Sequence, residues 1–185
     1  MSFDRYSRHR QIFSILTSFF MVVVLSGCQT TTTNQYEATA RTTVTWQVQY
    51  GINPATAKQP RFEEFASASL LNRNGEKPEG RVIGPDDQGL WWPISPPRPT
   101  VDEVEQRKKF NEKATRPELL RSVDYQITFT KDGERVTRPT NYSVYRQVVK
   151  AYPSQTPLQL TLGVGVSGVD GISTHPTVEK AVPQQ

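Results

Sequence analysis

RTTVTWQVQY, residues 41–50, alternates between apolar and polar side chains from Thr43 onward. Successive side chains of a β-strand point to opposite faces, so this pattern predicts a strand with one buried face. The buried face would carry Val44, Trp46, Val48 and Tyr50. Gly51 and Pro54 follow and end the segment. This strand is the clearest in the chain.

A β-hairpin is predicted farther along the chain. Residues 122–130, SVDYQITFT, alternate in the same way, and the dipeptide Asp132-Gly133 follows. Asp-Gly is typical of the tight type I′ turn that joins two antiparallel strands. The return segment, residues 135–149, contains Pro139, which has no N–H to donate to a neighbouring strand. We therefore expect this return strand to be broken or to lie at an edge.

The remaining segments vary in clarity. Residues 157–166, PLQLTLGVGV, alternate strictly and predict another strand. Residues 61–73 fit a helix and a strand equally well. Residues 76–100 contain nine prolines and glycines, which predicts a long loop, and their apolar residues indicate that this loop packs onto the domain.

One helix is predicted over residues 101–114. Thr100 fits the N-cap position, and Glu103 stands three residues later, as in a capping box. Acidic residues come early and basic residues late, which suits the helix dipole. The apolar stripe is thin, and Phe110 falls roughly opposite Val101. A surface helix with modest anchoring is expected.

Together these elements predict an α+β domain: a small antiparallel sheet of four to five strands, one surface helix and a long proline-rich loop. We expect one globular domain over residues 41–166. Residues 28–40 are polar and rich in threonine, which favours a flexible tether. Residues 167–185 show no packing pattern and are interpreted as a C-terminal tail.

Composition limits the chemistry that is expected. The 185 residues contain one cysteine and two histidines, at positions 9 and 175. A single cysteine forms no internal disulfide, and two histidines do not make a histidine-rich metal site. No Ser-His-Asp arrangement, nucleotide-binding glycine loop or EF-hand pattern is evident. The sequence therefore predicts no catalytic residues, no metal and no cofactor.

The N-terminus has the layout of an export signal. Residues 1–10 carry three arginines and one aspartate, and 11 of the 14 residues from Ile12 to Leu25 are apolar. Small residues follow at Ser26 and Gly27. A basic start, a short apolar run and a small-residue end are typical of a secretory signal peptide. The run is shorter than the roughly 20 residues that span a bilayer.

Leu25-Ser26-Gly27-Cys28 resembles the lipobox of bacterial membrane lipoproteins. The resemblance covers residues 1–28 only. It implies that residues 1–27 form a signal peptide and that the thiol of Cys28 carries a diacylglyceryl group, with a further acyl chain on the new amine. One acyl chain binds a membrane marginally, whereas two or three hold a protein firmly.

Removal of residues 1–27 also changes the charge. The whole chain has a net charge of +4, and three of its arginines and one aspartate lie in the signal segment. The mature chain keeps an excess of only two positive charges, so a nucleic-acid partner is not expected.

Adjacent tryptophans mark the most unusual segment of the loop. Trp91 and Trp92 precede a proline-rich run that contains Arg98. Together these three residues form a candidate binding site, an aromatic platform for sugar rings or for a partner. The opposing interpretation is that one or both rings cover the hydrophobic core, since tryptophan is usually mostly buried.

The sequence thus predicts a lipid-anchored protein of the bacterial cell envelope, with its domain facing the periplasm or the exterior. Its expected role is structural or interactive rather than enzymatic, through an envelope protein or the cell wall. One alternative is a glycan- or peptidoglycan-binding lipoprotein that uses the Trp91-Trp92 loop. A further alternative is a hydrolase in which two carboxylates converge in a pocket.

Overall fold

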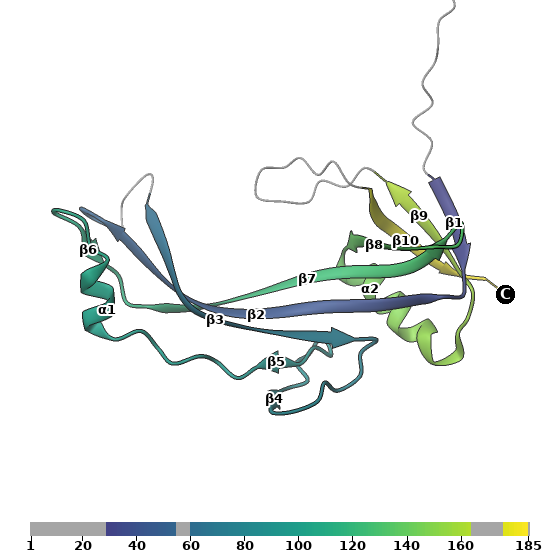
Figure 1. Ribbon diagram of the computed structural model, residues 1–185, viewed down its shortest axis with the longest axis horizontal. Coiled ribbons are helices and arrows are strands. Elements are labelled where there is room, and N and C mark those ends of the chain that lie inside the picture. The colour runs from purple at the N-terminus through teal and green to yellow at the C-terminus, as the bar shows by residue number, and fades with distance from the viewer. Residues whose placement is uncertain (1–28, 55–59, 164–175, 185) are drawn as a thin grey trace, which may run out of the picture.

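The computed structural model describes residues 29–54, 60–163 and 176–184. Its main feature is one eight-stranded sheet in the order β1-β9-β10-β8-β7-β2-β3, with β6 also paired to β2, beside a two-stranded sheet of β4 and β5 (Figure 1). The elements are β1 (Gln29–Thr33), β2 (Tyr36–Gly51), β3 (Arg61–Arg73), β4 (Val82–Ile83), β5 (Trp92–Pro93), α1 (Val101–Gln106), β6 (Lys113–Ala114), β7 (Glu118–Lys131), β8 (Glu134–Thr140), α2 (Tyr142–Ala151), the 3₁₀ turn η1 (Tyr152–Ser154), β9 (Leu158–Gly163) and β10 (Thr177–Pro183).

The predicted α+β class is wrong. The described residues are mostly β, with 53% in strands and 14% in helices. The main sheet is larger than four to five strands, and it is mixed, because β10 runs parallel to β8 while the other pairs are antiparallel. Among the described residues, no helix is long and apolar enough to cross a membrane.

Two of the strands that the sequence did not predict lie in the segments expected to be a tether and a tail. Residues 29–33 form β1, and residues 36–40 begin β2, where Tyr36, Ala38 and Ala40 are buried in the core. Residues 177–183 form β10. Threonine is β-branched and fits a strand as well as a linker, and two of the buried residues are alanines, so no apolar period marks the segment.

The strands with clear alternation are confirmed. Val44, Val48 and Tyr50 of β2 are buried, as are the leucines of β9. The Asp132-Gly133 turn joins β7 to β8, and both residues have positive φ, of 52° and 82°. The ambiguous residues 61–73 form β3.

A second helix replaces the end of the expected return strand. β8 stops at Thr140, and the side chain of Asn141 accepts a hydrogen bond from the N–H of Val144 at 3.1 Å, which caps α2. The helix buries one face in the core of the sheet; its buried residues are Val144, Tyr145, Val148 and Ala151. Val144 and Val148 are four residues apart, a spacing that fits one side of a helix and also one face of a strand. The sequence pattern therefore did not distinguish this helix from the expected strand.

The predicted capping box is confirmed, but α1 is shorter than expected. Thr100 and Glu103 bond reciprocally at its start, and the helix ends at Gln106. Only Val104 of this helix is buried. One buried residue does not hold a longer helix, so the chain turns and continues into β6.

The molecule consists of a body and an arm (Figure 1). We call the arm the part of the sheet that β2, β3 and β7 form beyond the body, with residues 41–51, 61–71 and 118–124 respectively. The body contains β1, β8, β9, β10, α2 and the remaining parts of β2, β3 and β7, whereas β6 lies at the far end of the arm. β2 has 16 residues, which corresponds to about 50 Å at roughly 3.3 Å per residue.

The segment from residue 84 to α1 covers one face of the arm. Its carbonyl groups accept hydrogen bonds from the sheet at three successive points: Thr42 Oγ1 to Trp91 O at 2.7 Å, Trp46 Nε1 to Pro96 O at 2.9 Å, and Tyr50 Oη to Val104 O at 2.9 Å. The other face of the arm carries Thr, Ser and Gln side chains that are partly or fully exposed.

Candidate functional site

The two tryptophans do not form a shared exposed platform. Trp92 is 8% exposed, its Nε1 donates to Asp86 Oδ2 at 2.7 Å, and the Arg121 guanidinium lies 5.1 Å from its ring centre. Trp91 is half-buried, with the Lys77 ammonium 5.4 Å from its ring. Trp92 therefore belongs to the cover of the sheet, which is the core interpretation that the sequence had left open.

Arg98 is exposed and belongs to the same segment that covers the sheet. Its guanidinium lies 5.7 Å from the centre of the Trp46 ring. Trp46 itself is half-buried rather than buried as predicted, because the proline-rich segment covers it only in part. Cys28, the expected lipidation site, lies outside the described residues.

Asp86 is the organising residue of the loop, a role that the sequence did not reveal. Besides the Trp92 indole, its carboxylate accepts hydrogen bonds from the N–H groups of Gln88 at 3.0 Å and Leu90 at 2.8 Å. The loop buries Leu90 completely, so the carboxylate fixes the turn that directs Leu90 and Trp92 inward. An aspartate three residues before a glycine is a turn signal, but its indole partner lies beyond local sequence patterns.

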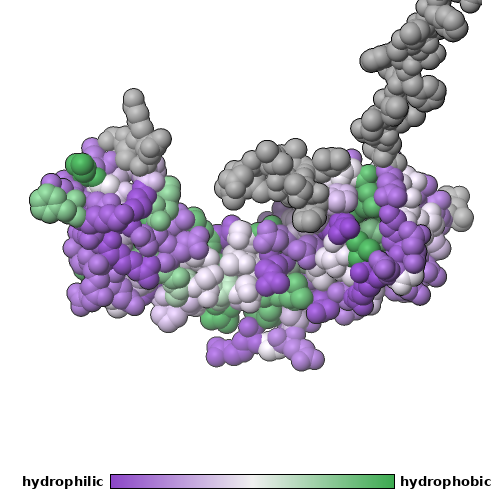
Figure 2. Space-filling view, turned by 45° about the horizontal axis from the view of Figure 1, so that its top comes forward, coloured by the Kyte–Doolittle hydropathy of each residue, from purple (hydrophilic) through white to green (hydrophobic). Residues whose placement is uncertain are grey.

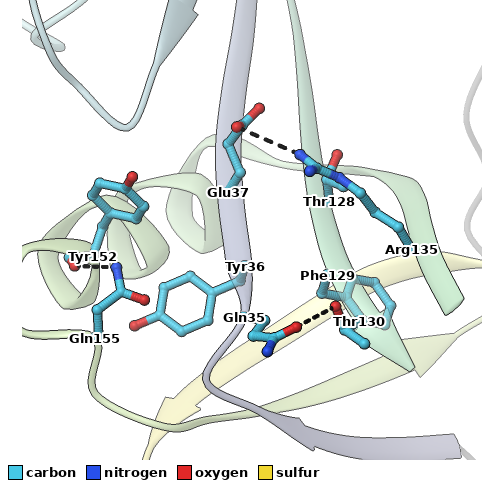
Figure 3. Close-up of a pocket in the computed structure, with 9 residues that line it drawn as sticks. All are labelled: Gln35, Tyr36, Glu37, Thr128, Phe129, Thr130, Arg135, Tyr152 and Gln155. Atoms are coloured by element: carbon cyan, nitrogen blue, oxygen red, sulfur yellow. Dashed lines mark hydrogen bonds and ion pairs between the residues drawn. The ribbon is translucent and has the colours of Figure 1, made fainter. Parts of the chain in front are cut away.

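A small polar cavity of about 260 Å³ lies in the body, beside the start of β2 (Figure 3). Its polar groups bond to protein atoms. Tyr36 Oη donates to the carbonyl oxygens of Ala151 and Thr156, and Thr130 Oγ1 donates to Gln35 Oε1 at 3.0 Å. Glu37 pairs with Arg73 at 3.0 Å and with Arg135 at 3.5 Å. These contacts join the start of β2 to α2, β3 and β8, and join Gln35, just before β2, to β7, so we assign the cavity a structural role.

Carboxylates at the far end of the arm are used in ion pairs. Arg61 pairs with both Glu63 and Glu112. In the part of the chain that the structure describes, no group of three or more His, Cys, Asp or Glu side chains is placed to hold a metal ion. The hydrogen bonds from Arg61 and from the Lys109 N–H lower the pKa of Glu112 to about 2.

This pKa gives a prediction for acid stability. The lowered pKa of Glu112 stabilises the fold above the ordinary value of 4.5, and that contribution is lost as the pH falls toward 2. Glu112→Gln should therefore melt below the parent at neutral pH, and the gap should close by about pH 2. Thermal melts across this range measure the gap, with exposed Glu79→Gln as the control that shows none. A gap that stays constant with pH contradicts the ion pair.

The most distinctive feature of the arm is the free edge of β3. In an antiparallel pair, only alternate residues of a strand bond to its neighbour through their backbone groups. The hydrogen bond from Asn74 N to Ala38 O shows which residues of β3 bond to β2. By this alternation, the N–H and C=O groups of Ser67, Ser69 and Leu71 point away from the sheet. No described residue bonds to the N–H groups of these three. Residues 65–72 carry no charge and no proline, which are the usual means of protecting an edge.

β7 has a free stretch on the opposite side of the arm. β8 pairs with β7 only from Tyr125 onward, so no strand among the described residues pairs with residues 118–124 on that side. This stretch is shorter and carries Glu118, Arg121 and Asp124. Charged side chains discourage the addition of another strand, so the β3 edge is the better surface for strand pairing.

The sequence could not locate this edge, because strand order depends on contacts between distant residues. Its only signal was the uncharged run within residues 61–73. Comparison of the chain with protein families, with curated proteins and with solved structures finds no match.

Proposed function

We propose that this chain is a lipid-anchored protein of the bacterial cell envelope that acts by binding a partner protein and not by catalysis. Two features support the proposal. The N-terminal 28 residues have the pattern of a lipoprotein signal that ends at Cys28, and the described chain has an arm with a free strand edge. The domain would face the periplasm or the exterior.

The observation that carries the interaction role is the free edge of β3. An extended peptide can add to such an edge through main-chain hydrogen bonds, while alternate side chains select the sequence. β3 is 13 residues long, and its central part is uncharged. Its N–H and C=O groups at Ser67, Ser69 and Leu71 match the spacing of an added strand. The partner is therefore a protein segment that binds in extended form.

Two substitutions at Ser69 test strand addition. Ser69→Pro removes the outward N–H, and it should be tolerated because that N–H does not bond to β2. Ser69→Ala keeps the N–H and is the matched control. We expect Ser69→Pro to reduce in-cell crosslinking to the partner at least about tenfold, the effect of roughly 1.4 kcal/mol, while Ser69→Ala leaves it unchanged.

Thermal melts of both variants test whether the fold is kept. Equal crosslinking of the same protein by two folded variants would overturn the role of the β3 edge.

A further inference from the structure

Large apolar side chains are exposed at the end of the arm that lies farthest from the body. Phe110 is 93% exposed and Ile52 is 76% exposed. β6 pairs with the end of β2, with Gly51 opposite Lys113, so the turn that carries Phe110 lies beside the residue that follows β2. Figure 2 shows green, apolar atoms at this end of the molecule among hydrophilic ones. We call Ile52 and residues 108–113 the tip.

The turn that presents Phe110 is held rigidly. Glu112 N donates to Lys109 O at 3.1 Å, and Glu112 Oε2 accepts from Lys109 N at 2.8 Å. Asn111 adopts a positive φ of 61° between them, and Arg61 binds the Glu112 carboxylate from β3. Three contacts thus fix a turn with a phenyl ring exposed at its apex, so the exposure of Phe110 does not come from a loose loop.

The charges around the ring are basic. Lys109 and Lys113 form no ion pair with a described residue, whereas Lys108 pairs with Glu105, and Arg107 with Glu63. Glu112 is neutralised by Arg61. An aromatic and an aliphatic side chain between free lysines complement an anionic lipid surface, because the apolar groups enter the headgroup region and the ammonium groups meet phosphates.

The shape of the molecule directs the tip toward the side where the chain enters the fold. β1 begins at Gln29, directly after Cys28, on the upper side of Figure 1. The arm curves, and its β6 end lies on that same upper side, while the covering segment and β4 lie on the lower side (Figure 1). A flat surface placed against the start of β1 and the β6 end would therefore leave the covering segment on the outside.

From these observations we propose that the tip is a second membrane contact. Phe110 and Ile52 enter the anionic surface of the membrane that holds the acyl chains of Cys28, and Lys109 and Lys113 bind its phosphates. This inference rests on the proposed lipid anchor. It makes the arm lie along the membrane, with its two contacts separated by about the length of β2, roughly 50 Å.

Fluorescence quenching tests the contact. The full lipid-anchored chain with Phe110→Trp is placed in vesicles of equimolar phosphatidylcholine and phosphatidylglycerol with brominated acyl chains. The added fluorescence, measured against the parent chain, should be largely lost. Val101→Trp is the matched control, since Val101 is 75% exposed at the same end but on α1, which covers the lower side, and its fluorescence should remain.

The lysines supply a second test. Replacing Lys109 and Lys113 by glutamine in the Phe110→Trp chain should lower the ratio of inserted to free tip about fivefold for each lysine, and vesicles of phosphatidylcholine alone should have a similar effect. If quenching is the same after the lysine substitutions and in vesicles of phosphatidylcholine alone, the proposed role of the lysine charges is wrong.

The two proposals fail in different ways. The mass of the N-terminal peptide shows whether Cys28 is lipidated, and an unlipidated chain would contradict the proposed lipid anchor. A lipidated chain whose Phe110→Trp fluorescence is unquenched on vesicles overturns the tip contact alone.

Discussion

Asp86→Ala should lower the free energy of unfolding by about 2–4 kcal/mol. The carboxylate accepts hydrogen bonds from two N–H groups and from the Trp92 indole at 2.7–3.0 Å. Hydrogen bonds to a charged group contribute about 1.5–3 kcal/mol each when buried, and partial exposure of this site reduces their sum. Loss of the carboxylate also frees the loop that keeps Leu90 and Trp92 inside.

Thermal or urea unfolding measures this effect, which corresponds to about 10 °C in Tm for a chain of this size. Asp87→Ala is the matched control, because the neighbouring Asp87 is exposed and its side chain bonds to no described residue. Its melting should be unchanged. If both variants melt together at the parent temperature, the loop is held by packing alone and Asp86 does not organise it.

Cys28→Ala should remove the protein from the membrane fraction or leave it as an uncut precursor. The thiol is the only side chain in the sequence that can form the thioether to diacylglycerol. Two or three acyl chains bury enough CH₂ groups, at about 0.8 kcal/mol each, to make release negligible, and their loss reverses this. Detergent phase separation and the mass of the N-terminal peptide measure the outcome.

Ser26→Ala is the control for the signal segment, since it keeps a small residue near the cut and should be processed and lipidated normally. A Cys28→Ala protein that is cut at the same place and stays in the detergent phase would contradict the lipobox interpretation.

Local patterns predicted the parts of the fold that local forces determine. Val44, Val48 and Tyr50 alternate with polar residues and are buried, and the Asp132-Gly133 turn and the Thr100 cap form as expected. The strands β1 and β10 were not predicted because their local sequences show no strand pattern. They are stabilised by pairing with β9, a contact between distant parts of the chain. Residues 142–148 show the opposite error, since two valines at helical spacing also suited a strand.

The candidate site was less accessible to sequence reasoning. Trp92 was proposed for a ligand, but Asp86 and Arg121 hold it against the sheet. The free edge of β3 follows from strand order, which local sequence does not encode. Phe110 was expected opposite the buried stripe of a helix, and it is exposed for a different reason, because the helix ends at Gln106 and a fixed turn follows.

The most direct test of the account is site-specific photo-crosslinking in cells. A photoreactive residue replaces Ser69 beside the free β3 edge or, in a matched chain, Ser122 near the opposite edge of the arm; both side chains lie on the uncovered face. The account predicts that Ser69 crosslinks to a defined envelope protein and Ser122 does not, and that Cys28→Ala weakens the product. Equal crosslinking from both positions, or none from Ser69, would contradict it.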